Sequence, residues 1–158
     1  MLTTKEEKFP AKSGVGVIVA RFQVDELTTG HRQLIESVMA RHNSVVIILG
    51  SNGAGSSTEN NPLDFRTRQL MVNSSYPRVE VGNVNDCDDD ALWSRCIDSE
   101  IRLRTTIGSK VTLYGGRDSF AKYYSGGYEV KILESDSDSS GTKSRDSLRE
   151  LANKSNRE

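Results

Sequence analysis

The sequence has few of the residues on which disulfide scaffolds, metal centres and membrane spans depend. Among 158 residues it holds two cysteines, three prolines, two histidines and one tryptophan. The cysteines have no metal-ligand spacing with the histidines, which indicates reduced thiols rather than a disulfide framework or a zinc site. No apolar run approaches the ~20 residues of a membrane-spanning helix, and no signal-peptide pattern is visible. We therefore expect a cytoplasmic globular protein.

An excess of charge of one sign is also lacking. The chain has 21 Lys and Arg against 22 Asp and Glu, for a net charge of −1. This balance excludes a broad basic face for nucleic acid or an anionic membrane, so any anion site must be local. The length favours one domain. We place that domain at residues 14–152, between a flexible arm at 1–13 and a frayed tail at 153–158.

Short apolar runs alternate with amphipathic segments along the domain. Strands are predicted at residues 15–20, 44–49, 78–84, 110–114 and 128–133. Helices are predicted at 32–42, after Pro62, at about 89–104, at 120–124 and at 145–152. In the helix near 89–104 we expect the inner side to carry Leu92, Cys96, Ile97, Ile101 and Trp93. The alternation predicts an α/β fold with an open parallel sheet of about five strands and helices on both faces.

The stretch 14–31 carries the strongest functional pattern. Its apolar strand is followed by the polar loop Arg21-Phe22-Gln23 and then by Thr28-Thr29-Gly30-His31, which leads into a helix. A helix N-terminus offers N–H groups and the positive end of the helix dipole, and a glycine lets a ligand approach the backbone. A hydroxyl and a histidine at that place are suited to meet a phosphoryl oxygen.

Two further polar motifs lie near the C-terminal part of the chain. Gly116-x-Asp118 follows the fourth predicted strand, and Ser140-Gly141-Thr142-x-x-Arg145 precedes the last predicted helix. Hydroxyls, N–H groups and an arginine at a helix start can clamp a polyphosphate. By composition alone, however, residues 134–145 are a flexible linker and Asp118 is a helix cap. Both interpretations stay open on these residues alone.

An acidic run, Asp86–Asp90 with Cys87 inside it, precedes the single tryptophan, Trp93. Carboxylates favour the positive end of a helix dipole, so the run predicts a solvated helix start. A dedicated metal site is less favoured, because Mg²⁺ at phosphates usually arrives with the nucleotide. Two interpretations of Trp93 stay open, namely stacking on an aromatic ligand and burial in the core.

Taken together, these motifs resemble the nucleotidylyltransferase superfamily. Thr28-x-Gly30-His31 resembles its (His/Thr)-x-Gly-His motif, and Arg21-Phe22-Gln23 resembles the Arg-Phe-Gln of the nicotinamide mononucleotide adenylyltransferase branch. Further similar motifs follow in family order: Asn61-Pro62, Gly116-x-Asp118, and Ser140-Gly141-Thr142-x-x-Arg145. The chain departs from the pattern in two extra residues before Thr28, and in Ser139 and Ser144 at positions that are apolar in the family. The resemblance implies a Rossmann-like nucleotidylyltransferase fold, present as the adenylyltransferase domain only.

The resemblance also implies a reaction and a set of site residues. AMP would pass from ATP to nicotinamide mononucleotide, with Mg²⁺ arriving on ATP and with NAD and pyrophosphate as products. Catalytic roles fall on His31, Thr28 and Arg145. ATP would contact Arg21, Phe22, Gln23, Gly30, His31, Gly116, Asp118, Ser140, Gly141, Thr142 and Arg145. The acceptor would contact Trp93, Asn83 and Arg68. We expect neither a nucleic-acid nor a membrane partner, and a homo-oligomer is an open alternative.

Three other functions stay open at this point. The first is the same chemistry on another acceptor, either phosphopantetheine, for which Thr-x-Gly-His is the usual form, or an alcohol phosphate. The second is a non-catalytic nucleotide-binding domain, which pyrophosphate release would distinguish from an enzyme. The third is an α/β interaction domain in which every motif is a cap or a turn. Trp93 and Arg21-Phe22-Gln23 favour the pyridine nucleotide.

Overall fold

The computed structural model describes residues 12–24, 26–51, 63–116 and 120–133. Within these ranges, strands and helices alternate as the sequence predicts. The elements are β1 (Val15–Ala20), α2 (Thr29–Arg41), β2 (Ser44–Ser51), α3 (Phe65–Ser75), β3 (Glu80–Asn85), α4 (Asp90–Arg104), β4 (Val111–Gly115), the 3₁₀ helix η1 (Phe120–Tyr123) and β5 (Glu129–Ile132). The helix predicted at 145–152 lies outside the described residues.

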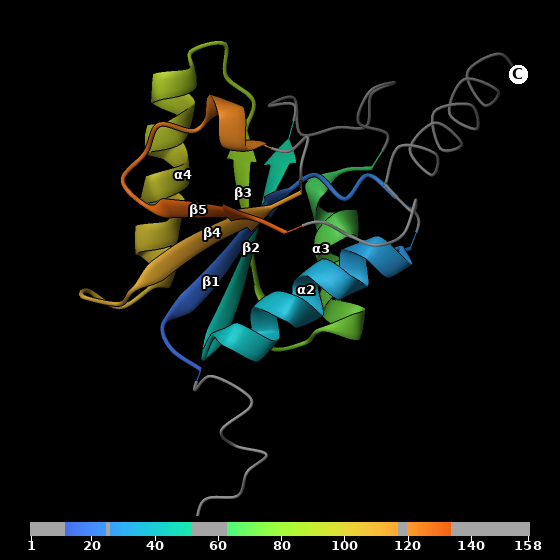
Figure 1. The fold of residues 1–158 in the computed structure, drawn as a ribbon. Coiled ribbons are helices and arrows are strands. Elements are labelled where there is room, and N and C mark those ends of the chain that lie inside the picture. The colour runs from blue at the N-terminus through green and yellow to red at the C-terminus, as the bar shows by residue number, and fades with distance from the viewer. Residues whose placement is uncertain (1–11, 25, 52–62, 117–119, 134–158) are drawn as a thin grey trace, which may run out of the picture.

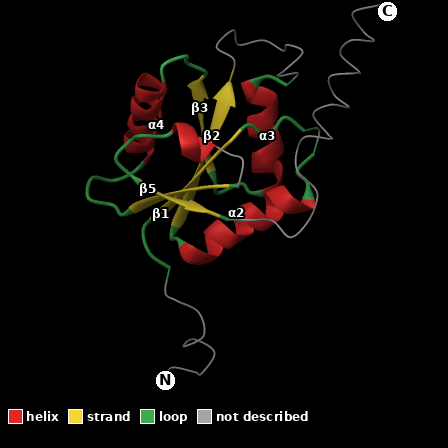
Figure 2. Cartoon of the chain, turned by 45° about the horizontal axis from the view of Figure 1, so that its top comes forward, coloured by secondary structure: helices red, strands yellow, loops and turns green. Residues whose placement is uncertain are grey.

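The strands form one parallel sheet in the order β3-β2-β1-β4-β5. Helices α2 and α3 cover one face and α4 covers the other, as Figures 1 and 2 show. The prediction of an open parallel sheet with helices on both faces is thus confirmed. The chain runs outward from β1 through β2 to β3, then returns to β4 on the other side of β1. The point where the order reverses therefore lies between β1 and β4, and ligands of such sheets bind at the carboxyl ends beside that point.

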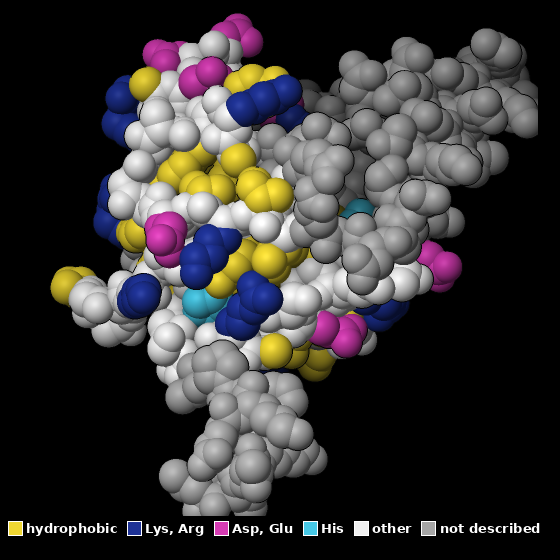
Figure 3. Space-filling view, in the orientation of Figure 1, with side chains coloured by type: hydrophobic (Ala, Val, Ile, Leu, Met, Phe, Trp, Pro, Cys, Tyr) yellow, Lys and Arg dark blue, Asp and Glu magenta, His cyan; other side chains and the backbone are white. Residues whose placement is uncertain are grey.

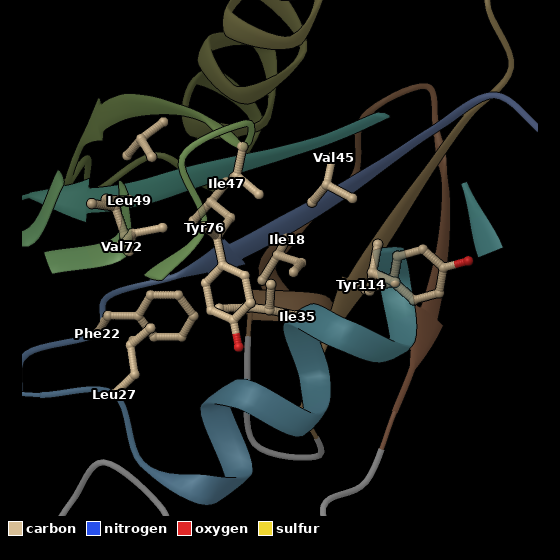
Figure 4. Packing of buried hydrophobic residues seen from close by; sticks show 13 residues of the cluster. Ile18, Phe22, Leu27, Ile35, Val45, Ile47, Leu49, Val72, Tyr76 and Tyr114 are labelled. Atoms are coloured by element: carbon tan, nitrogen blue, oxygen red, sulfur yellow. The ribbon is translucent and has the colours of Figure 1, made fainter. Parts of the chain in front are cut away.

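Side chains from alternate positions of the central strands build two apolar layers. Toward α2 and α3, Ile18, Ile47 and Leu49 pack with helix residues that include Ile35 and Val72 (Figure 4). Toward α4, the strand residues Val17, Val46 and Ile48 pack with Ile97 and Ile101. Because both faces are covered, these strands appear in the sequence as continuous apolar runs rather than as alternating patterns.

Helix α2 begins at Thr29, three residues before the predicted start at Arg32. Thr28 is its N-cap: Oγ1 accepts the backbone N–H of His31 at 3.2 Å. In return, Nδ1 of His31 accepts the backbone N–H of Thr28, also at 3.2 Å. The pair forms a capping box in which histidine stands where glutamate is usual. This exchange satisfies two backbone donors and extends the helix to the motif itself.

The inner side of α4 differs in part from the prediction. Ile97 and Ile101 are buried as expected, but Leu92 is 42% exposed and Cys96 is exposed as well. Ser94 is buried on the inner side instead. Its Oγ donates to the carbonyl of Asp90 at 2.7 Å and accepts the backbone N–H of Ser125 at 2.9 Å. A serine can be buried here because its hydroxyl group is hydrogen-bonded on both sides.

Candidate functional site

The carboxyl ends of the strands and the N-termini of α2, α3 and α4 lie at the same edge of the sheet, since each helix follows a parallel strand (Figure 1). Thr28 and His31 come after β1, and Gly116 comes after β4, so they flank the point where the strand order reverses. The predicted site residues at this edge within the described ranges are Arg21, Phe22, Gln23, Thr28, Gly30, His31, Arg68, Asn83, Trp93 and Gly116. Asp118, Ser140, Gly141, Thr142 and Arg145 lie outside those ranges, as does Asn61-Pro62.

The geometry of the capping box determines the tautomer of His31. Because Nδ1 accepts the N–H of Thr28, the neutral ring carries its proton on Nε2. Burial lowers the pKa of His31 to about 4, so the ring is neutral at physiological pH. Among the residues that the structure describes, Nε2 has no hydrogen-bond partner. His31 thus offers a neutral N–H donor at the N-terminus of α2.

Phe22 supports this ring from the end of β1. Its φ angle of 49° lies in the left-handed region, which is unusual for a bulky residue and is tolerated where the surroundings enforce it. The turn directs the Phe22 side chain into the core beside Leu27 and Tyr76 (Figure 4), where it is 5% exposed. Its ring centroid lies 4.8 Å from that of His31. Phe22 therefore packs against the imidazole ring from the core side and restricts its orientation.

Gln23 is buried and joins the loop after β1 to the start of α3. Its Nε2 donates to the carbonyl of Leu63, and its Oε1 accepts the Leu63 backbone N–H, both at 2.9 Å. Asp64, which follows Leu63, caps α3: its Oδ1 accepts the backbone N–H of Thr67 at 2.8 Å. The contacts described for Gln23 thus go to the protein backbone.

Arg68 on α3 is 1% exposed and ties together the ends of two strands. Its Nη1 donates to the carbonyls of Arg21 at 2.8 Å and Gly50 at 2.7 Å, and its Nη2 donates to Oγ of Ser51 at 2.9 Å. Nε donates to the carbonyl of Asp64 at 3.2 Å. Burial lowers the pKa of Arg68 to about 10, which leaves it charged at neutral pH. Arg68 thus lies at the carboxyl edge of the sheet, as predicted, but its side chain is buried and bonds the protein rather than facing solvent.

Two polar links extend from this edge to β3. Ser51 Oγ donates to Oδ1 of Asn83, and Nδ2 of Asn83 donates to Oδ1 of Asn85 at 3.3 Å. Arg21 forms an ion pair with Asp86, the residue after β3. Neither the contacts of Ser51 nor the role of Asp86 was predicted. The sequence signal for Ser51 is its place between an apolar run and a glycine-rich stretch.

The rest of the acidic run matches its prediction, because it begins a helix. Asp89 is the N-cap of α4, and its Oδ1 accepts the N–H groups of Ala91 at 2.9 Å and Leu92 at 3.2 Å. Asp90 lies in the first turn. In the described ranges, no group of three or more His, Cys, Asp or Glu side chains is arranged to hold a metal ion.

Trp93 lies in the first turn of α4 and is half-buried. Its ring centroid is 6.4 Å from that of Phe120, whose own centroid is 6.0 Å from that of Tyr124. The indole thus packs on the α4 side of the core and keeps part of its surface exposed near the carboxyl edge.

The described surface has mixed charge. On the face shown in Figure 3, basic and acidic side chains are interspersed rather than gathered by sign. None of the helices in the described part of the chain has the length and apolar character that crossing a membrane requires.

Comparison with known proteins identifies the fold. Neither a protein-family model nor a curated protein matches the chain. A bifunctional NMN adenylyltransferase/ADP ribose pyrophosphatase from Francisella tularensis matches with a TM-score of 0.71 and 16% identity, over 85% of this chain and 42% of that one. Its complex with AMP and a manganese ion matches with a TM-score of 0.72 and 16% identity, over 85% and 41% of the two chains. A NadR protein in complex with NAD and AMP-PNP matches with a TM-score of 0.64 and 17% identity, over 87% and 42%.

These likenesses show that the chain has the α/β open-sheet fold of NMN adenylyltransferase structures. The chain spans 42% of the length of the first solved structure that it matches.

Proposed function

We propose that this protein transfers AMP from ATP to nicotinamide mononucleotide and releases pyrophosphate. The observation that carries the proposal is the Thr28–His31 pair at the N-terminus of α2, beside the point where the strand order reverses. The fold likeness supports it, since similar structures include an NMN adenylyltransferase bound to AMP and a NadR protein bound to NAD and AMP-PNP.

In the proposed reaction, a phosphate oxygen of the acceptor attacks the α-phosphorus of ATP. The bond from that phosphorus to the oxygen bridging to the β-phosphate breaks, and pyrophosphate leaves with the electron pair. No covalent enzyme intermediate is needed, so the protein contributes position and charge stabilisation. His31 donates its Nε2–H to an α-phosphate oxygen, where negative charge builds. The dipole of α2 acts in the same direction.

The remaining roles extend the site around both substrates. We assign the β- and γ-phosphates to Thr142 and Arg145, with Mg²⁺ entering as part of the MgATP substrate. Trp93 is assigned to the pyridine ring of the acceptor, where its exposed surface can stack. The other nucleotide-binding positions are Arg21, Phe22, Gln23, Gly30, Gly116, Asp118, Ser140 and Gly141.

The test is pyrophosphate release with ATP, Mg²⁺ and nicotinamide mononucleotide. We expect His31→Ala to lower turnover by about 10²-fold, as loss of one preorganised donor to developing charge usually does. The variant also loses half of the capping box, at about 1 kcal/mol, so thermal unfolding must show that it is still folded. Thr28→Ala should lower activity as well, and Thr29→Ala, on the exposed neighbouring hydroxyl, is the matched control. Normal turnover in a folded His31→Ala variant would contradict the assignment.

A second candidate is the same transfer to phosphopantetheine, which Thr28 in the first motif position favours. Acceptor-dependent release with that substrate in the same assay would keep the mechanism and replace the acceptor. ATP binding by calorimetry without pyrophosphate release on any acceptor would indicate a non-catalytic nucleotide-binding domain.

A further inference from the structure

A chain of hydrogen bonds runs from the buried guanidinium of Arg68 to a side chain at the carboxyl end of β3. Nη2 of Arg68 donates to Oγ of Ser51 at 2.9 Å, and Ser51 Oγ in turn bonds Oδ1 of Asn83. Arg68 is 1% and Ser51 7% exposed, whereas Asn83 is only half-buried. The chain of bonds thus begins in the interior and ends at a side chain that solvent reaches.

The direction of every proton in this chain is determined by chemistry. A guanidinium can only donate, so the lone pair that Ser51 Oγ turns toward Arg68 is occupied. The single hydroxyl proton of Ser51 is then free to point at Asn83, which must present its carbonyl oxygen there. This fixes the amide of Asn83 with Nδ2 pointing away from Ser51.

The Nδ2 group of Asn83 has two hydrogens and uses one of them. One hydrogen goes to Oδ1 of Asn85 at 3.3 Å. Within the part of the chain that the structure describes, the other hydrogen has no acceptor. Because solvent reaches the half-buried Asn83 side chain, a ligand at this edge can replace water as the acceptor of the second hydrogen.

The position of Asn83 points to one substrate. Asn83 lies near the carboxyl end of β3, and Trp93, the residue assigned to the pyridine ring, lies in the first turn of α4, the helix that follows β3. His31, in contrast, lies after β1 at the assigned α-phosphate. We propose that Arg68 is a positioning residue, which holds the Asn83 amide through Ser51 so that Nδ2–H donates to an oxygen of the acceptor mononucleotide. This inference rests on the proposed function for the identity of that acceptor.

Asn83→Asp tests the donor directly. The new carboxylate still accepts from Ser51 and attracts the charge of Arg68, so the variant should stay folded, while the donor hydrogens are lost. We expect KM and the calorimetric Kd for nicotinamide mononucleotide to rise about tenfold, the factor that matches 1.4 kcal/mol. KM for ATP and kcat should stay within about twofold, because only acceptor binding loses a contact. Unchanged acceptor affinity in this variant would overturn the proposal.

Ser51→Ala tests the hydrogen-bond chain from Arg68 through Ser51 to Asn83, which we call the relay, without removing a group that contacts the acceptor. It should weaken acceptor binding about threefold, because the Asn83 amide becomes free to turn. In an Asn83→Ala background the same change should have no further effect on acceptor Kd, which is the result expected of residues that act through one another. Ser74→Ala, an exposed serine on α3, is the matched control. An effect of Ser51→Ala that persists without the Asn83 amide would overturn the relay and leave only a structural role.

Failure of the relay and failure of the proposed function give different results. Pyrophosphate release by the wild-type chain tests the function, and the variants then test the relay. If the wild type binds nicotinamide mononucleotide without turnover, the function fails and the Kd values still decide the relay. If the wild type does not bind it, both proposals are wrong.

Discussion

Removal of the buried Arg68 guanidinium should destabilise the protein strongly. In Arg68→Met the apolar stem is retained, but the donors to the carbonyls of Arg21, Gly50 and Asp64 and to Ser51 Oγ are lost. Four bonds from a charged donor at about 2 kcal/mol each amount to roughly 8 kcal/mol. An opposing effect is that the variant avoids the free-energy cost of moving a charged guanidinium from water into the protein interior.

The magnitude of that opposing effect follows from the pKa of Arg68. Burial lowers it from 12.5 to about 10, which corresponds to about 3 kcal/mol at about 1.4 kcal/mol per unit. The difference leaves a net loss of about 5 kcal/mol in the free energy of unfolding. With a urea m-value of about 2 kcal/mol per molar, the midpoint should fall by about 2.5 M.

Urea unfolding followed by Trp93 fluorescence and by helical circular dichroism measures this directly. Arg66→Met is the matched control: Arg66 is exposed on the same helix and bonds the side chain of Gln69 at 3.0 Å. The control should stay within about 0.5 kcal/mol of the wild type. If Arg68→Met is as stable as Arg66→Met, the cost of burying the charge cancels its hydrogen bonds, and Arg68 does not stabilise the fold.

Two further predictions concern His31 and Tyr76. Burial lowers the pKa of His31 from its ordinary 6.5 to about 4 in the fold. Between these pH values the unfolded chain therefore binds more protons, and stability falls as the pH falls. From pH 7 to pH 5 the wild type should lose about 2 kcal/mol more than His31→Gln in urea unfolding, and equal losses would refute the buried neutral ring. Tyr76→Phe removes the donor to Glu36 Oε2 at 2.6 Å and should cost about 1 kcal/mol. Pyrophosphate release by that variant should be normal, and a loss of activity would show that the α2–α3 contact affects the site.

Features that depend on one element and its burial could be predicted from the sequence. Residues 15–20 are the predicted and the observed bounds of β1, because a strand covered on both faces needs an unbroken apolar run. The start of α2 was missed for a local reason. Thr28-x-x-His31 is a capping box, but the usual sequence pattern ends in glutamate or glutamine, and a histidine at that position is not recognised by it.

Features that depend on a distant partner could not be predicted. The family resemblance singles out Arg68 rather than Arg66 as a site residue, but it does not predict that Arg68 is buried, since both arginines lie on a helix of mixed polarity. What buries Arg68 is the set of carbonyls at the ends of β1 and β2, and these meet only once the sheet has formed. The pairing of Arg21 with Asp86, 65 residues apart, has the same origin. Topology, rather than local pattern, decides which charged side chains are buried.

The two histidines show how one residue type serves two purposes at opposite ends of α2. His42, the C-cap, uses both ring nitrogens inside the protein: Nδ1–H donates to the carbonyl of Ser13 at 2.8 Å, and Nε2 accepts from the Tyr114 hydroxyl at 2.7 Å. His31 uses only Nδ1 in the described structure, and its Nε2–H lies at the edge where phosphates bind in such folds. The capping bond that starts the helix also determines which nitrogen carries the proton. Folding of α2 and preparation of the donor are therefore the same event. In His31→Asn, Oδ1 can still accept the Thr28 N–H, but the shorter side chain places no donor at the position of Nε2, so this substitution should separate stability from turnover.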